Sequence, residues 1–154
     1  MRPAFTLLIF LGLVAAAALT GMSFRPGAWY EALAKPDWTP PNWLFPPAWT
    51  VLYVMIAVAG WRVFEKHGFV PALIVWAVSL QLNAAWSVLM FKEHQIGLAA
   101  ADIAALWLSI VAFIALTWKT NRVASVLFVP YLAWVSYAAA LNFAIWQLNP
   151  NAPV

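Results

Sequence analysis

The sequence contains no cysteine and very few charged residues. Its 154 residues include only 8 lysines and arginines and 5 aspartates and glutamates. The absence of cysteine excludes disulfide frameworks, thiolate metal sites and cysteine nucleophiles. Charged residues make up 8% of the chain, whereas soluble domains carry about 25%. Because 66% of the residues are hydrophobic, the chain cannot cover itself with polar surface, and we expect an integral membrane protein.

The signatures of several common chemistries are also missing. The two histidines, His67 and His94, fall in predicted connectors on opposite sides of the membrane, so no span offers a haem or zinc ligand. We find no HExxH motif, glycine-rich phosphate loop or Ser/His/Asp set. The net charge of +3 is small and scattered, which does not favour a nucleic-acid partner. We therefore expect no metal, no required cofactor and no nucleic acid.

Five apolar segments are long enough to cross a bilayer, which takes about 20 helical residues. We predict an all-α membrane protein, a five-helix transmembrane bundle in one domain covering residues 1–154. The expected helices cover residues 3–22, 43–64, 70–91, 95–118 and 123–148, with Pro130 interrupting the last. The first segment also resembles a signal peptide, but its length favours a retained helix.

The connectors predict how the helices alternate across the membrane. Short connectors between the last four helices force antiparallel neighbours, and residues 23–42 form the one long connector. Five basic residues fall on the side of the N-terminus and three on the other side, which favours a cytoplasmic N-terminus. The five are Arg2, Arg62, Lys66, Lys119 and Arg122, and the three are Arg25, Lys35 and Lys92.

The long connector leads into a stretch rich in tryptophan and proline, WYEALAKPDWTPPNWLFPPAW from Trp29 to Trp49. Proline fixes φ and removes a backbone donor, so Pro36, Pro40 and Pro41 prevent a continuous helix here. A loop with so many apolar rings should fold back onto apolar surface. We predict that it caps an internal pocket between the helices.

Polar side chains within the helices should lie at one depth beneath this loop. Counting about 1.5 Å per residue from the loop-side helix ends places Asn83, Asp102 and Asn142 about 9–12 Å deep, level with Trp49. A carboxylate is expensive in hydrocarbon, so Asp102 should face the bundle interior, neutral or hydrogen-bonded to Asn83 or Asn142. These groups suit helix–helix association and the polar wall of a ligand site equally well, and the two roles are compatible.

Aromatic residues share helix faces with these polar groups. An apolar cavity lined by rings with a few convergent polar groups is typical of small-molecule sites, although any single tryptophan is more often a packing or lipid-facing residue. Trp43, Trp118 and Trp146 lie near segment ends and are better interpreted as an interfacial belt. The residues that share faces are Trp49 and Tyr53, Asn83 and Trp86, and the series Trp134, Ala138 and Asn142.

Three segments together resemble the TspO/MBR family, the tryptophan-rich sensory proteins related to the mitochondrial translocator protein once called the peripheral benzodiazepine receptor. They are the stretch from Trp29 to Trp49, then LNAAWSVLMF, then PYLAWVSYAAALNF. The resemblance runs from about Trp29 to Asn149. It implies a five-helix homodimer in a bacterial cell membrane, without indicating whether this is the inner or the outer membrane. It also implies a pocket under the first loop for porphyrins such as protoporphyrin IX and for benzodiazepine-site ligands.

Carried over position by position, the resemblance assigns pocket residues. Trp49 and Trp134 match two tryptophans implicated in light-dependent porphyrin breakdown in some bacterial members, so they are the catalytic candidates if the protein is an enzyme. Two positions depart from the family pattern: Ser79 stands where glutamine is frequent, and Phe143 with Gln147 replaces the cholesterol motif of animal members. The matching positions are Tyr30, Pro40, Trp49, Asn83, Phe91, Trp134, Ala138 and Asn142, to which depth adds Asp102.

Three functions remain open on this reading. The first is a tetrapyrrole-binding sensor, carrier or scavenger, with Arg25, Lys35 or Lys92 meeting the carboxylates of the ligand. The second is a light- and oxygen-dependent porphyrin-degrading enzyme. The third is a regulatory partner of another membrane protein, using the small-residue faces at residues 12–18 and 99–105. We rank them in that order.

Overall fold

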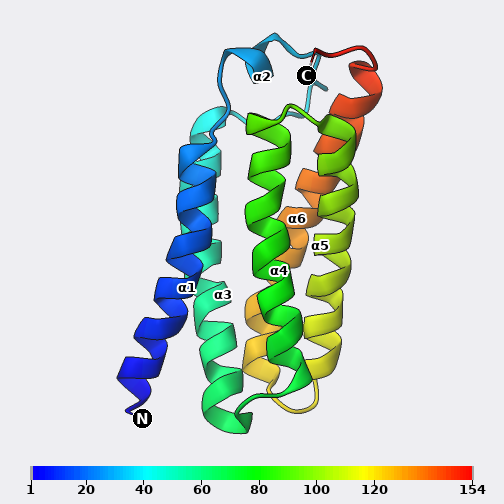
Figure 1. The fold of residues 1–154 in the computed structure, drawn as a ribbon. Coiled ribbons are helices and arrows are strands. Elements are labelled where there is room, and N and C mark those ends of the chain that lie inside the picture. The colour runs from blue at the N-terminus through cyan, green and yellow to red at the C-terminus, as the bar shows by residue number, and fades with distance from the viewer. Residues whose placement is uncertain (1, 154) are drawn as a thin grey trace.

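The structure, a computed structural model, describes residues 2–153, and within them five long helices run side by side as one bundle (Figure 1). Each is long and apolar enough to cross a membrane, which confirms the predicted five-helix membrane bundle. The residues described contain no strand. The long helices are α1 (Pro3–Ser23), α3 (Phe45–His67), α4 (Pro71–Ser87), α5 (Ile96–Thr117) and α6 (Arg122–Leu148).

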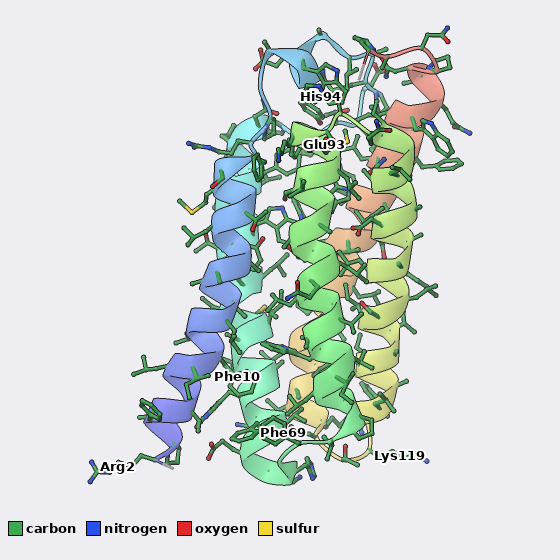
Figure 2. All side chains as sticks on the ribbon, in the orientation of Figure 1. Arg2, Phe10, Phe69, Glu93, His94 and Lys119 are labelled. Carbon is green, nitrogen blue, oxygen red and sulfur yellow. The ribbon has the colours of Figure 1, made fainter. Side chains whose placement is uncertain are left out.

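Three short elements lie at the end of the bundle that also holds the C-terminus. The connector between α1 and α3, residues 24–44, contains the short helix α2 (Ala28–Ala32) and the 3-10 turn η1 (Asn42–Leu44). We call residues 24–44 the lid, because they cross this end of the bundle (Figure 1). The third element, the π-helical turn η2 (Val88–Lys92), continues α4 where a regular α-helix was predicted to residue 91. Figure 2 places Glu93 and His94 at this lid end, and Arg2, Phe69 and Lys119 at the opposite end.

Proline and glycine set several helix boundaries. The first turns of α1, α3 and α4 contain proline, which is tolerated there because those amides have no intrahelical acceptor. Gly68 has φ +68° and follows the last residue of α3, a conformation that glycine adopts without strain. Pro130 lies inside α6, and the helix continues through it from Arg122 to Leu148 rather than being interrupted. Membrane helices tolerate such prolines because neighbouring groups satisfy the freed carbonyl.

The five helices close into a ring in the order α1, α3, α6, α5, α4. Helix α3 packs against α1 and α6, helix α5 packs against α6 and α4, and α4 returns to α1. This order does not follow the chain, since α3 and α6 are neighbours in space. It determines which side chains can meet in the interior.

The half of the bundle away from the lid, which we call the filled half, is tightly packed. The Trp76 ring packs edge-on against Phe10, with the ring centroids 5.1 Å apart, and its Nε1 donates to the Ile56 carbonyl at 2.9 Å. A Cβ added to Gly60 would lie 2.6 Å from the Trp76 ring. Helix α3 therefore needs glycine at this position so that a tryptophan on α4 can occupy the space between α1, α3 and α4.

Candidate functional site

A cavity of about 550 Å³ lies under the ends of the lid, between α1, α3 and α4. Small-molecule sites usually occupy about 300–1,000 Å³, so its size suits a ligand. Its walls are mostly aromatic, and no residue of α5 or α6 is among those described in its lining. The lining residues are Ala18, Gly21, Met22, Phe24, Arg25, Pro26, Asn42, Trp43, Phe45, Pro46, Trp49, Thr50, Tyr53, Asn83, Trp86, Ser87 and Phe91.

A hydrogen-bonded chain of side chains forms the polar part of the cavity wall. The Tyr53 hydroxyl donates to Oδ1 of Asn83 at 3.0 Å, and Nδ2 of Asn83 donates to the Tyr131 hydroxyl at 2.8 Å. Asn83 thus links α3, α4 and α6. The Asn83 amide bonds a tyrosine on each side, and the cavity wall around it consists mostly of rings, with the Ser87 hydroxyl beside them.

Three of the sequence-predicted residues line the cavity, and three others support the rings that do. Trp49, Asn83 and Phe91 are in the wall. Behind Trp49 stands Trp134, whose ring packs edge-on at a centroid distance of 6.3 Å. Tyr30 packs edge-on against Phe91 at 5.6 Å.

Asn142 completes this supporting layer from α6. Its Oδ1 accepts the indole N–H of the lining residue Trp86 at 2.8 Å, and its Nδ2 donates to the Ile96 carbonyl at 3.1 Å. Asn142 is buried, so it fixes the Trp86 ring from the side away from the cavity. Its role in this structure is positioning rather than contact with the cavity.

The structure does not bring the remaining predicted residues to the cavity. Pro40 and Ala138 are buried away from it. Asp102 on α5 is buried too, and its Oδ2 has no hydrogen-bond partner among residues 2–153. The expected bonds from Asp102 to Asn83 or Asn142 are not formed, and both amides bond other partners instead. Equal depth therefore did not mean a common wall.

The π-helical turn at the end of α4 positions Phe91. Amide N–H groups of Glu93 and Gln95 donate back to the carbonyls of Val88 and Leu89, at 2.9 and 2.8 Å. Such wide turns are rare and occur mostly near functional sites. Here the turn carries Phe91 into the cavity wall, where its ring contacts Trp86 edge-on at 5.4 Å.

The middle of the lid is fixed to α6 and to the α4–α5 connector. The Ala34 amide donates to Oδ1 of Asn149 at 2.9 Å, and Nδ2 of Asn149 donates back to the Ala34 carbonyl at 2.8 Å. Trp29 stacks on His94 with the ring centroids 4.1 Å apart. Burial raises the pKa of Tyr30 above its ordinary value, with a smaller contribution from nearby Tyr137, so its hydroxyl stays neutral.

Most lining residues were not predicted as part of the pocket, and Trp43 and Gly21 illustrate why. Trp43 was interpreted as an interfacial residue, but it lines the cavity at the mouth, with 72% of its surface exposed. Gly21 on α1 faces Ser87, and a Cβ there would lie 3.5 Å from the serine Oγ. The apolar pattern of α1 gave no sign of which face would meet a cavity.

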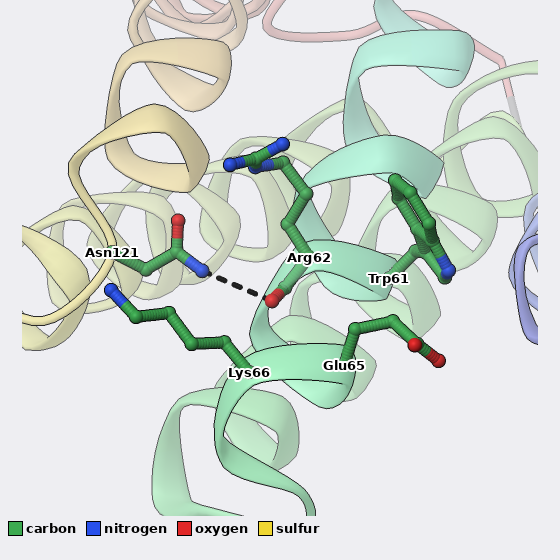
Figure 3. Close-up of a pocket in the computed structure, with 5 residues that line it drawn as sticks. All are labelled: Trp61, Arg62, Glu65, Lys66 and Asn121. Atoms are coloured by element: carbon green, nitrogen blue, oxygen red, sulfur yellow. Dashed lines mark hydrogen bonds between the residues drawn. The ribbon is translucent and has the colours of Figure 1, made fainter. Parts of the chain in front are cut away.

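A second, smaller depression of about 220 Å³ lies at the opposite end of the bundle (Figure 3). It is lined by Trp61, Arg62, Glu65, Lys66 and Asn121. Nδ2 of Asn121 donates to the Arg62 carbonyl at 3.0 Å, and Lys66 donates to the Thr120 carbonyl at 2.9 Å. These two bonds join α3 to the α5–α6 connector, whereas Glu65 accepts from Thr6 of α1 and the Trp61 indole donates to the same threonine.

The bundle and its cavity define an integral membrane protein with an aromatic, lid-covered chamber at one end. Comparison with known proteins gives the family. The sequence model of the TspO/MBR family matches residues 4–147, so the chain belongs to that family, as the motifs indicated.

Three relatives illustrate the range of similar proteins. Protein CrtK of Rhodobacter capsulatus is 42% identical over 89% of this chain and 88% of its own length. The tryptophan-rich sensory protein of Cereibacter sphaeroides is 39% identical over 95% and 92%. The translocator protein of Bos taurus is 38% identical over 94% and 88%.

Proposed function

We propose that this protein binds tetrapyrroles such as protoporphyrin IX in the cavity between α1, α3 and α4, as a sensor, carrier or scavenger in the membrane. One observation carries the proposal: a chamber of about 550 Å³ walled by the rings of Trp43, Phe45, Trp49, Tyr53, Trp86 and Phe91. Flat, apolar macrocycles suit such walls, because aromatic faces and edges pack with favourable geometry. The tetrapyrrole itself is the ligand, and no further cofactor is needed.

The experiment is a titration of the full chain in lipid nanodiscs with protoporphyrin IX, followed by tryptophan quenching and by the absorbance of the porphyrin. Trp49→Ala and Asn83→Ala should each weaken binding about tenfold, because each removes part of the wall. Trp107→Ala is the matched control, since Trp107 lies outside the cavity and bonds Ser136. Equal affinity in wild type and both wall variants would contradict the proposal.

A second candidate function is supported by the contact between two tryptophans. Trp49 lines the cavity and Trp134 stands directly behind it, with their rings nearly perpendicular at 86°. A ligand radical formed by light and oxygen next to Trp49 would have a second indole within contact for electron transfer. Illumination of the bound porphyrin should then give a product with a new absorbance band that Trp49→Phe and Trp134→Phe both abolish. An unchanged product spectrum in both variants would contradict this function.

A homodimer, which the family resemblance implies, stays a prediction. Cross-linking in native membranes would test it. The cavity described here is complete within one chain, so we propose that ligand binding does not require the partner copy.

A further inference from the structure

The charges around the cavity are unevenly distributed. Among the described residues that line it, Arg25 alone is charged. Three cations at this end could meet an anionic ligand: Arg25, Lys35 and Lys92. The structure separates them by what each side chain already contacts.

Lys35 is occupied by the lid itself. Its Nζ donates to the carbonyls of Tyr30, Glu31 and Leu33 at 2.8, 3.1 and 3.1 Å, and it also lies 4.9 Å from the Tyr30 ring centroid. A lysine ammonium has three donors, so this residue has none left for a ligand. Its role is to close the end of α2.

Lys92 is partly neutralised and lies outside the lining. Its Nζ is 3.6 Å from a carboxylate oxygen of Glu93 and 5.6 Å from the Phe24 ring centroid. More than half of its side chain is exposed. An exposed, paired ammonium of this kind contributes little to recognition.

Arg25 has no such partner. Its guanidinium makes no hydrogen bond or ion pair with another residue in 2–153, and it lies two residues after the end of α1, at the rim of the cavity. The polar groups deeper in the cavity, Asn83 and Tyr53, are bonded to each other. The described lining therefore offers its one charged donor at the rim, while the interior offers rings and neutral polar groups.

We infer that Arg25 makes the cavity selective for apolar ligands that carry a carboxylate at one end, and that it fixes their orientation. The inference rests on the proposed function. The ring system enters between Trp49 and Trp86, and the carboxylate stays at the membrane surface against the guanidinium. An arginine binds a carboxylate through two parallel N–H donors, which gives direction as well as affinity.

The test compares protoporphyrin IX with its dimethyl ester, which has the same macrocycle without the carboxylates. Both are titrated into the full chain in nanodiscs of neutral lipid, for wild type, Arg25→Gln, Arg25→Lys and the matched control Lys92→Gln. Because the two porphyrins partition differently into lipid, the quantity compared is each variant's acid-to-ester affinity ratio divided by that of wild type. We expect this ratio to fall about tenfold in Arg25→Gln, which is the loss of one charge-assisted hydrogen-bonded pair.

The ratio for Arg25→Lys should lie between those of wild type and Arg25→Gln, because lysine keeps the charge and loses the fork of donors. The ratio for Lys92→Gln should match wild type. A loss of affinity that is equal for acid and ester in Arg25→Gln would mean a structural role and overturn the inference. So would an unchanged ratio in that variant, or the same fall in Lys92→Gln. If neither porphyrin binds the wild-type chain, the proposed function itself fails and the inference fails with it.

Discussion

The two halves of the bundle are built on the same three helices, α1, α3 and α4. The filled half is packed with side chains, whereas the half beneath the lid, which we call the hollow half, contains the cavity. In the filled half, Gly60 has no side chain, so the Trp76 ring can occupy the middle of the space and contact Phe10. In the hollow half, the rings of Trp49 and Trp86 are held to the sides by residues of α6. The difference shows that small side chains such as those of Ala18 and Ser87 are not the only source of the cavity. It also depends on large side chains, Trp49 and Trp86, whose positions are fixed from behind.

Replacing one tryptophan in each half, Trp76 or Trp49, should separate an effect on stability from an effect on binding. The loss of stability in Trp76→Ala is the largest effect that we expect. Trp76→Ala removes a nearly fully buried ring and its hydrogen bond, and should lower the free energy of unfolding by about 3–5 kcal/mol. Trp49→Ala should cost much less stability, because its ring borders empty space, while it weakens porphyrin binding. Thermal unfolding in detergent and porphyrin titration measure the two effects. Similar destabilisation by both variants would contradict the comparison.

Adding a methyl group to a glycine of each half should have opposite outcomes. Gly60→Ala places a Cβ 2.6 Å from the Trp76 ring, and overpacking of this kind costs about 1–3 kcal/mol. Gly21→Ala places its Cβ 3.5 Å from Ser87 and 3.8 Å from Tyr53, which is ordinary contact, so stability should hold. Thermal melts of the two variants, measured in parallel, test this prediction. A lower melting temperature for Gly21→Ala than for Gly60→Ala would refute the assignment of filled and hollow halves.

The polar groups of α4 should also differ between the halves. Asn83→Ala removes the amide that joins Tyr53 to the fully buried Tyr131, and should cost about 1–3 kcal/mol by leaving that hydroxyl unpaired. Ser79→Ala, four residues earlier, is the control, because Ser79 bonds only the carbonyl of Trp76 in its own helix. Comparison of their melting temperatures tests this. Equal shifts would mean that the interhelical amide bonds add nothing.

The smallest effect is expected at the lid. Asn149→Ala removes both hydrogen bonds to the Ala34 backbone and should loosen the lid by about 1 kcal/mol without changing the stability of the bundle. Amide hydrogen exchange should become faster in residues 28–38 only. Asn151→Ala is a nearby control outside this pair. Faster exchange along α3 or α4 would show that the lid supports the helices themselves.

Much of the fold could be predicted from composition and segment length. Five apolar segments of membrane-spanning length were sufficient to locate α1, α3, α4, α5 and α6, and prolines marked the starts of the first three. The π-helical turn at Val88 was not predictable, because VLMFK contains neither the proline nor the glycine that usually marks a helix irregularity.

The depth of the site residues in the membrane was predictable, but the side from which each approaches the cavity was not. Counting residues brought Trp49 and Asn83 to the lid end, and the family resemblance added Phe91; all three line the cavity. It could not show that Asn142 and Trp134 approach from behind, because the side of the helix that faces a cavity depends on the order of helices around the ring. That order, with α3 beside α6, results from packing between segments far apart in the chain. Arg25 was one of three possible anion partners until the contacts of Lys35 and Lys92 were known.

The pair that fixes the lid joins residues 115 positions apart, Ala34 and Asn149. During synthesis, the first connector leaves the ribosome long before the residue that anchors it. The lid can meet the α4–α5 connector earlier, through the stacking of Trp29 on His94, but the two bonds that hold its backbone at Ala34 form only once Asn149 has been made. Full fixation of the lid is thus a late step in biogenesis, and a chain that ends before Asn149 lacks both of these bonds.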